Sequence, residues 1–449
     1  MGSEAAPPET RPTNVRWVVF ALAFGTSWLL YLHRYSLGVI KPELEKEFNW
    51  NNEQLGLLDS AFFLFYTIFQ FPCGVLADVF GVRLFLAGMI LLWSAMLGLQ
   101  ALVFPGAWWL SPLAVLFCLR ALFGLGQAGA YAVLSRITRF WFPLSVRTSV
   151  QGWIAVFAGR IGGASSNLLF ATVLVGTFLL SWRVSLQLFA LAGVVLAVLF
   201  WLLFRDSPRQ HPWVNKAEAD LIEGGGRRAT RKLSVRDLFR GMNRRSVLNL
   251  LALNLQSFLS TVADFIYVGW IPQFLSQTYN MSAYDRGIYA TLPLLGGACG
   301  GPLGGYLNDW LIRRTGDRRR ARVLVGLAGK GTAAVLLVAG IILCFHDPVA
   351  FSVTLFFVKL FGDWSLAGSW GTVTDIGGRA TATVFAFNNT VAGVGAVIAP
   401  PLLGLLAAKQ GWDAVFLAVA ATYALCAVSW LLIDSTIPLL AESPAEPIP

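Results

Sequence analysis

Long apolar segments alternate with short polar connections along the whole chain. Twelve of these segments are near the length of roughly 20 residues that a helix needs to cross a bilayer core. They are too long, and alternate too little in polarity, for the strands of a membrane barrel, so we predict membrane-spanning helices. The predicted spans are 16–40, 53–77, 83–104, 109–135, 146–172, 182–204, 246–275, 285–307, 321–344, 349–372, 378–407 and 412–433.

One long basic connector divides the spans into six and six. We expect a tail over 1–15, a six-helix bundle over 16–204, the connector over 205–245, a second six-helix bundle over 246–433 and a tail over 434–449. Basic residues gather in the connections on the connector's side, and such a bias marks the cytoplasmic face. We therefore predict a multi-pass protein of the plasma membrane (the inner membrane of a bacterium) with both termini in the cytoplasm.

Composition agrees with a membrane protein. Of 449 residues, 56% are hydrophobic and 13% are charged, whereas soluble proteins average about 25% charged residues. The net charge of +10 follows from the basic connections, so it does not indicate nucleic acid as a partner. The five cysteines and three histidines lack the spacing of a metal site. We expect no metal, no cofactor and no enzymatic activity, and we expect a monomer in contact with the lipid bilayer.

A glycine–aspartate–arginine pattern occurs once in each half, after the second and the eighth span. We interpret both copies as loops that form a structural and gating latch. Such a repeat indicates an internally duplicated membrane protein. The first copy contains Gly74, Asp78, Gly81 and Arg83, and the second contains Gly305, Asp309 and Arg313.

Three arginines fall inside first-half spans, where a charge is costly and usually faces a cavity. These are Arg34, Arg120 and Arg160. No deep carboxylate partner is obvious in the first half, and arginine cannot escape by losing its proton. A bound carboxylate or phosphate would accept paired hydrogen bonds from such guanidinium groups. The arginines therefore predict a small anionic substrate.

Uncharged side chains complete the predicted substrate site. Gln127 shares a face of the fourth helix with Arg120, two turns away. Asn388 and Asn389 lie in the middle of the eleventh span, and Trp270 lies in the seventh. We expect the amides to hold hydroxyl groups, and the aromatic ring to pack on the carbon frame, although interhelical packing is an open alternative for all three.

The second half adds charges with several open interpretations. Lys359 and Asp363 stand at the i, i+4 spacing of a local ion pair and can neutralise each other. Asp264 can pair across the cavity with an arginine. Arg160 can pair with Gln127 or face a neighbouring helix.

Six plus six spans with this repeated pattern resemble the major facilitator superfamily. Several stretches resemble, more narrowly, its anion:cation symporter family, and they are 31–37, 120–127, 141–147, 370–375 and 387–390. The resemblance implies an all-α transporter of two six-helix bundles that moves a small organic anion, a sugar acid or other carboxylate, by alternating access. Arg34 and Arg120 would hold the negative group. The alternatives are an organophosphate or phosphate antiporter of the same superfamily and, more remotely, a non-transporting sensor.

Two departures from the family pattern concern ion coupling. His33 stands where the family usually has Asp, and Gln127 stands where it usually has Glu. Because an amide does not titrate, position 127 cannot carry a proton. Three possibilities follow: exchange or uncoupled transport, coupling through Asp264 or Asp363 with Lys359 nearby, or titration of His33, whose charge changes near neutral pH. A co-transported or counter-transported ion is thus an expected partner.

Overall fold

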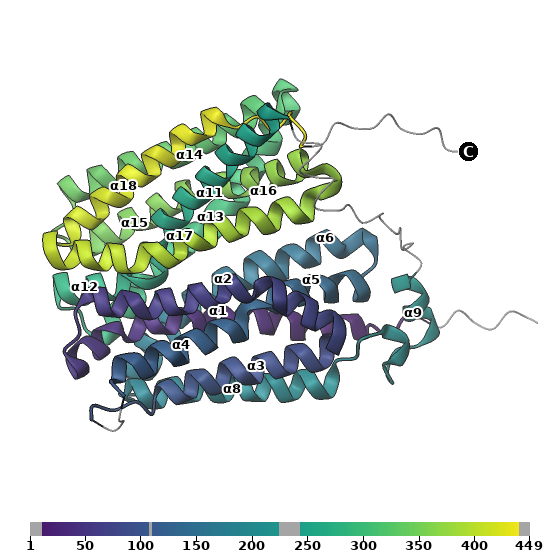
Figure 1. Ribbon diagram of the computed structural model, residues 1–449, viewed down its shortest axis with the longest axis horizontal. Coiled ribbons are helices and arrows are strands. Elements are labelled where there is room, and N and C mark those ends of the chain that lie inside the picture. Colours follow the sequence, from purple (N-terminus) through teal and green to yellow (C-terminus); the bar gives the residue numbers. More distant parts are fainter. Residues whose placement is uncertain (1–10, 107–109, 224–242, 440–449) are drawn as a thin grey trace, which may run out of the picture.

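The computed structural model describes residues 11–106, 110–223 and 243–439, and throughout these ranges the regular structure is helical. Each predicted span falls on a helix or on two consecutive helices, so the predicted all-α membrane fold is confirmed. Figure 1 shows the first-half helices on one side of the molecule and the second-half helices on the other.

The first half contains α1–α8 and the described part of the connector contains α9. Bounds in order are α1 Val15–Phe48, α2 Asn52–Phe80, α3 Val82–Gln100, α4 Pro112–Ala128, α5 Ala130–Trp141, α6 Leu144–Gly152, π-helical η1 Trp153–Phe157, α7 Ala158–Ser166, π-helical η2 Asn167–Thr177, α8 Trp182–Leu203, 3₁₀ turn η3 Pro208–Gln210 and α9 Lys216–Glu223.

The second half contains α11–α18. Bounds in order are α11 Arg244–Gly269, α12 Ile271–Tyr279, α13 Ala283–Thr315, α14 Arg318–Leu343, α15 Pro348–Gly362, α16 Trp364–Gly377, 3₁₀ turn η4 Gly378–Ala380, α17 Thr381–Gln410, α18 Trp412–Ser429 and 3₁₀ turn η5 Trp430–Leu432.

Eleven described helical segments are long and apolar enough to cross a membrane. Helix α13 coincides with the predicted eighth span and has 33 residues, but seven of them are glycine, which lowers its hydropathy. Three of these glycines, Gly296, Gly300 and Gly304, recur every four residues. A Cβ on each would lie 2.1–2.3 Å from backbone atoms of α15 or α16. The glycines therefore let α13 pack directly on its neighbours, as small residues do in membrane helix pairs.

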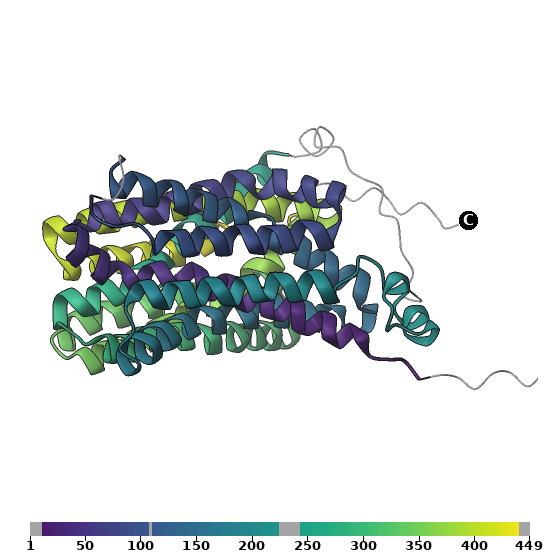
Figure 2. The same cartoon turned by 90° about the horizontal axis from the view of Figure 1, so that it is seen from below.

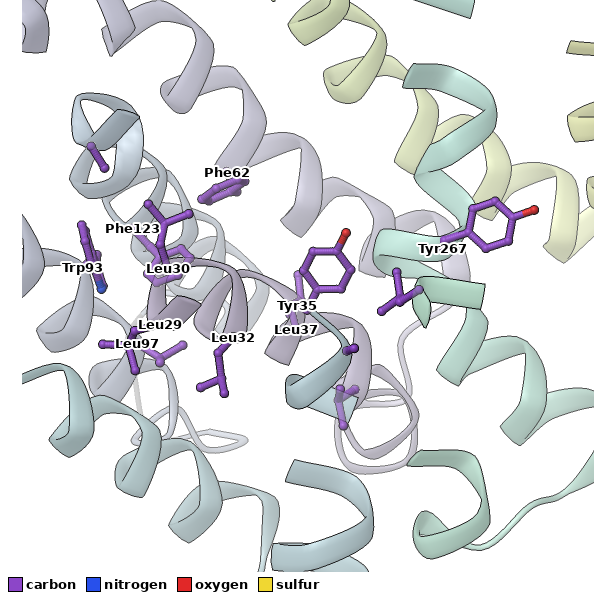
Figure 3. Packing of buried hydrophobic residues seen from close by; sticks show 14 of the residues in the cluster. Leu29, Leu30, Leu32, Tyr35, Leu37, Phe62, Trp93, Leu97, Phe123 and Tyr267 are labelled. Carbon is purple, nitrogen blue, oxygen red and sulfur yellow. The ribbon is translucent and has the colours of Figure 1, made fainter. Parts of the chain in front are cut away.

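The two ends of the molecule differ. Helix α9 lies at one end, here called the connector end, and α12 lies at the other, here called the far end (Figure 1). The view in Figure 2 shows the same separation of α9 from the far end. Apolar packing fills each half between these ends, and Figure 3 shows Phe62, Phe123 and Trp93 gathered beside the leucines of α1.

The repeated glycine–aspartate–arginine segments are helix ends rather than the loops predicted. Helix α2 continues through Gly74 to Phe80, and Gly81, with φ of 78°, separates it from α3. Helix α13 likewise continues through Gly305 to Thr315. The pattern contains no residue before Gly81 that prevents helical backbone, so each helix extends beyond the apolar part of its span.

Candidate functional site

A cavity of about 210 Å³ lies against the second half and extends from its middle toward the connector end. Its deep part contains Asp363, at the junction of α15 and α16, and its outer part contains Val373 and Phe385, near the junction of α16 and α17. Its lining combines amide, hydroxyl and charged groups with apolar ones. The polar lining residues are Gln256, Ser257, Ser260, Thr261, Asp264, Lys330, Asp363, Ser365, Ser369, Asn388 and Asn389.

Five charged side chains form an ion network in the middle of the molecule, here called the central cluster. They are Arg160, Asp264, Lys330, Lys359 and Asp363. Asp363 accepts from Lys359, one turn before it, and from Arg160 at 2.7 Å. Arg160 comes from α7 in the first half, so its ion pair with Asp363 joins the two halves. This pair resolves an alternative from the sequence, because Arg160 contacts neither Gln127 nor a neighbouring helix alone.

Asp264 is the second carboxylate of the central cluster. Its oxygens lie 3.1 Å from Lys359 Nζ and 3.9 Å from Lys330 Nζ. The Tyr423 hydroxyl donates to it at 2.6 Å, and Lys330 also donates to Ser260 Oγ at 2.8 Å. Its cationic partners are therefore lysines of its own half rather than an arginine across the cavity. Lys359 bridges both carboxylates, so the local Lys359–Asp363 pair is one link of a larger network.

Backbone features hold the central cluster in place. Asp363 lies where α15 ends and α16 begins, so its side chain leaves the helix surface at a break. A Cβ at Gly297 would lie 2.6 Å from Asp363 Oδ2 and 3.4 Å from Arg160 Nη1. The missing side chain at Gly297 thus leaves the space in which the inter-half ion pair forms.

Arg160 lies on a short α-helix between two π-helical segments. Helix α7 is preceded by η1 and followed by η2. Wide π turns are rare and frequently mark functional sites. Gly159 and Gly163 bring α7 against Tyr31 and Tyr35 of α1, because a Cβ at either glycine would lie within 3.2 Å of a tyrosine ring. In Figure 3 Tyr35 stands between the first-half core and Tyr267 of α11.

A second group of charges lies in the first half and is here called the gate cluster. It consists of Arg34, Lys41, Asp59 and Arg120. Lys41 Nζ lies 2.6 Å from Asp59 Oδ2, and Arg120 Nη2 lies 4.0 Å from Asp59 Oδ1. The guanidinium carbons of Arg34 and Arg120 both lie 5.1 Å from the ring centre of Phe62. The lack of a deep first-half carboxylate, expected from the sequence, is thus incorrect for Arg120.

Gln127 contacts Arg34 rather than Arg120. Its Oε1 accepts from Arg34 Nε at 3.1 Å, and its Nε2 donates to the Leu30 carbonyl at 3.1 Å. Both functions of the amide are therefore used within the first half. Arg34 also lies 4.8 Å from the Tyr31 ring centre and 4.7 Å from that of Tyr66, which surrounds the guanidinium with polarisable faces.

Polar contacts between the halves concentrate at the far end. Arg286 pairs with Glu43 at 3.2 Å. Glu45 accepts from Gln273 and Gln277, each at 2.7 Å. Gln277 also bonds Asn52. Close backbone packing accompanies these bonds, because a Cβ at Gly404 would lie 2.3 Å from the Asn52 carbonyl oxygen. The far end is therefore closed in this conformation, while the cavity faces the connector end.

Two sequence-predicted site residues lie away from the cavity. Trp270 is fully buried, stacks near Trp412 and receives Lys41 over its ring at 3.4 Å. His33 is fully buried between α1 and α8, with Nε2 2.8 Å from the Phe189 carbonyl oxygen. A carbonyl can only accept, so this nitrogen carries a hydrogen. Their chain positions indicated depth in the membrane but not the direction in which each side chain points.

The two predicted asparagines both line the cavity. Asn388 donates to Ser257 Oγ at 2.8 Å, within the second half. Asn389 donates to Gln70 Oε1 at 2.9 Å and so contacts the first half. Asn389 is exposed, whereas Asn388 is mostly buried.

The repeated segments make local contacts at the connector end. Arg83 donates from its backbone to Asp206 at 3.0 Å and from Nε to the Trp201 carbonyl at 2.8 Å. The Asp78 side chain lies outside the described part of the structure. Asp309 and Arg313 are exposed on the last turns of α13. Arg83 thus ties α3 to the end of α8 and to the chain that follows it.

Sequence analysis missed two central lysines. Lys330 lines the cavity, and Lys41 crosses between the halves at the far end. Both are charges inside or beside apolar segments, the same signal that identified Lys359, so the sequence did contain the information. In the described part of the chain, no group of three or more His, Cys, Asp or Glu could hold a metal ion.

Known proteins resemble this chain over nearly its whole length. It is 29% identical over 437 residues to the "Probable sulfoacetate transporter" of Cupriavidus necator, with 93% of each chain covered. It is 27% identical over 450 residues to the "Probable galactarate/D-glucarate transporter" of Bacillus subtilis, covering 95% of this chain and 93% of the relative. It is 26% identical over 444 residues to the "D-galactonate transporter" of Escherichia coli, covering 94% and 96%.

Solved structures share the fold. A bacterial homologue of the human lysosomal transporter Spinster, in an inward-facing and unoccupied conformation, matches with a TM-score of 0.72 at 17% identity, covering 93% of this chain and 98% of that one. A nucleoside transporter matches with a TM-score of 0.66 at 14% identity, covering 93% and 99%. Residues 23–391 match the family described as Major Facilitator Superfamily. The protein therefore belongs to the Major Facilitator Superfamily and is a membrane transporter rather than an enzyme.

Proposed function

We propose that this protein moves a small organic anion, a sugar acid or other carboxylate, across the membrane by alternating access. The observation that carries the proposal is the cavity itself. It is bounded by the central cluster, faces the connector end, and is separated from the far end by direct contacts between the halves. One half rocking against the other would open the far end and close the connector end, as in transporters built from two repeats.

Charge favours an anion. The central cluster contains three cations, Arg160, Lys330 and Lys359, and two carboxylates, Asp264 and Asp363, so its formal charge is +1. The gate cluster adds three cations and one carboxylate. Excess positive charge at low dielectric attracts an anion strongly. Arg160 is the most accessible of the arginines, with 24% of its side chain exposed.

Hydroxyl recognition favours a sugar acid over a simple inorganic anion. Asn388, Asn389, Ser257 and Ser260 line one cavity wall with groups that both donate and accept hydrogen bonds, as polyhydroxy ligands require. Two of the relatives above are named for sugar acids and one for sulfoacetate. These names favour a carboxylate or sulfonate over an organophosphate.

Arg34, Arg120 and Gln127 remain proposed substrate residues for a different conformation. Arg120 is only 1% exposed here, so a substrate cannot reach it before the halves move. Trp270 is not proposed, because its ring already serves Lys41.

A substrate screen tests this proposal. Purified protein is heated with D-glucarate, D-galactonate, sulfoacetate or the neutral sugar galactose, since a specific ligand stabilises by mass action. We expect at least one anion to raise Tm and to exchange with labelled substrate in proteoliposomes, and R160Q to lose both effects. R209Q, which changes an exposed connector arginine, is the matched control. If galactose binds as well as the anions, or if R160Q matches R209Q, the proposed recognition is incorrect.

Orientation is part of the same proposal. We propose that the connector end is cytoplasmic and that the protein resides in the plasma membrane, on the strength of the basic residues near that end. A cysteine replacing Asn51 at the far end should react with an impermeant thiol reagent in intact cells, and one replacing Arg209 should not. The reverse labelling would invert the proposed orientation.

A further inference from the structure

Lys41 is a fully buried cation that joins the two halves at the far end. It comes from α1, and its Nζ donates to the Gly269 carbonyl at 2.8 Å, at the break between α11 and α12. The same nitrogen lies 3.4 Å from the ring centre of Trp270 and 2.6 Å from Asp59 Oδ2. The second-half backbone and the first-half carboxylate therefore share one ammonium group.

Asp59 connects this ammonium to the first-half arginines. Its other oxygen lies 4.0 Å from Arg120 Nη2. Among the described residues no acceptor bonds Arg120 Nη1, although Arg120 Nε donates weakly to the Leu58 carbonyl at 3.5 Å. Arg34 lies beside the same Phe62 ring as Arg120. One carboxylate thus serves several cations in a nearly sealed place.

The surroundings of Asp59 hold its position closely. A Cβ at Gly269 would lie 3.2 Å from Asp59 Oδ2, and one at Gly38 would lie 3.0 Å from the Val268 carbonyl oxygen. The charged groups that face Asp59 are Lys41 from α1 and Arg120 from α4. The second half contributes the Gly269 backbone, and α17, which packs along α2, has no acid or base before Lys409.

We propose that Asp59 is the proton-coupling carboxylate of this transporter, acting by releasing Lys41. The inference rests on the transport function proposed above. When the far end is open, Asp59 takes one proton from that side and becomes neutral. A neutral carboxyl group cannot balance a buried ammonium, so Lys41 no longer holds the far end shut. When the halves close again, Lys41 re-forms its ion pair and the carboxyl group gives its proton to water on the connector side.

Substrate and proton favour each other in this scheme. A substrate anion near Arg34 and Arg120 repels the charged carboxylate of Asp59, so its binding favours the protonated form. Protonation in turn leaves Arg120 free to bind the anion. The signs of both effects are those of symport, because linkage between two sites is reciprocal. Asp59 therefore replaces, in a new position, the titratable groups that Gln127 and His33 do not supply.

Proteoliposomes that contain a pH-sensitive dye test the inference. External D-glucarate or sulfoacetate is added without an imposed pH gradient, and exchange of labelled substrate is measured in parallel. We expect the wild-type protein to acidify the lumen, D59N to acidify it no faster than protein-free vesicles while still exchanging substrate, and D59E to restore acidification. D220N, at a half-exposed carboxylate of α9, should behave as the wild type.

A second variant covers loss of folding in D59N, which leaves Lys41 without its carboxylate. K41Q/D59N removes both charges together and should fold, exchange substrate and still fail to acidify the lumen. Acidification by D59N or K41Q/D59N at the wild-type rate would overturn the inference, and so would wild-type exchange without acidification. No exchange by the wild-type protein with any of the anions would instead overturn the proposed function.

Discussion

Around Lys41 and Arg120 the protein packs cations against aromatic faces, whereas around Asp264 and Asp363 it packs them against carboxylates and hydroxyl groups. The gate cluster has three cations and a single carboxylate, which the rings of Trp270, Phe62 and their neighbours supplement. A cation over an aromatic face is stabilised by about 0.5–2 kcal/mol without any compensating charge. The gate cluster therefore keeps a large positive excess in a buried place.

The central cluster is more accessible and more nearly neutral. Arg160 and Asp264 have 24% and 25% of their side chains exposed, compared with 1% for Arg120. Ligand atoms can thus reach the central cluster from the cavity, while the gate cluster is closed to them in this conformation. The difference indicates a division of roles, in which the central cluster binds substrate and the gate cluster responds to a change of charge.

Removing Asp363 should have the largest effect on this comparison. In D363N both Arg160 and Lys359 lose a carboxylate, and breaking a buried ion pair by removing one partner costs about 3–5 kcal/mol. We expect a lower Tm and no measurable transport. The double variant R160Q/D363N removes one cation and one anion together, so it should recover most of the Tm but no transport. Recovery of transport in the double variant would show that Arg160 does not bind substrate.

Gly297 allows a sharper test with a matched control on the same helix. A Cβ there would lie 2.6 Å from Asp363 Oδ2, whereas a Cβ at Gly301 would lie 3.9 Å from its nearest neighbour. Overpacking of this kind typically costs about 1–3 kcal/mol. We expect G297A to lower both Tm and transport rate, and G301A to change neither. Equal behaviour of the two variants in thermal unfolding and uptake would contradict the placement of the central cluster.

The sequence predicted the fold more completely than the site. All twelve spans follow from the length of their apolar runs, because the bilayer leaves helices as the main solution. Arg160, Asp264, Lys359 and Asp363 were identified as charges in apolar segments, but their partners were not. The Arg160–Asp363 pair joins positions about 200 residues apart on different halves, a separation at which no helical spacing rule applies.

Side-chain direction was the second limit of the sequence. His33 and Arg34 are adjacent on α1, so they point to different sides of the helix. Arg34 contacts Gln127 and His33 contacts the α8 carbonyl of Phe189. The sequence alone did not say which side faces the cavity. Asp59 was judged too near the end of its helix, yet it is the carboxylate that Lys41 and Arg120 share.

Phe62 offers the smallest and most specific test of the aromatic half of the comparison. The guanidinium groups of Arg34 and Arg120 both lie near its ring, whereas the adjacent Phe63 packs edge-on against Phe265. F62L and F63L remove similar apolar volume, so their common loss of stability cancels when the two are compared. The remaining difference should be about 0.5–2 kcal/mol, the value of a cation–aromatic contact.

We expect F62L to have the lower Tm and a several-fold weaker apparent affinity for the transported anion, and F62Y to match the wild type, because tyrosine keeps the aromatic face. Thermal unfolding and concentration-dependent uptake of D-glucarate or sulfoacetate measure both effects. If F62L and F63L lose stability and affinity equally, the aromatic faces do not balance the positive excess of the gate cluster. Asp59 would then have to balance Lys41 and Arg120 with little help, and its protonation should open the far end more readily than the ring contacts allow.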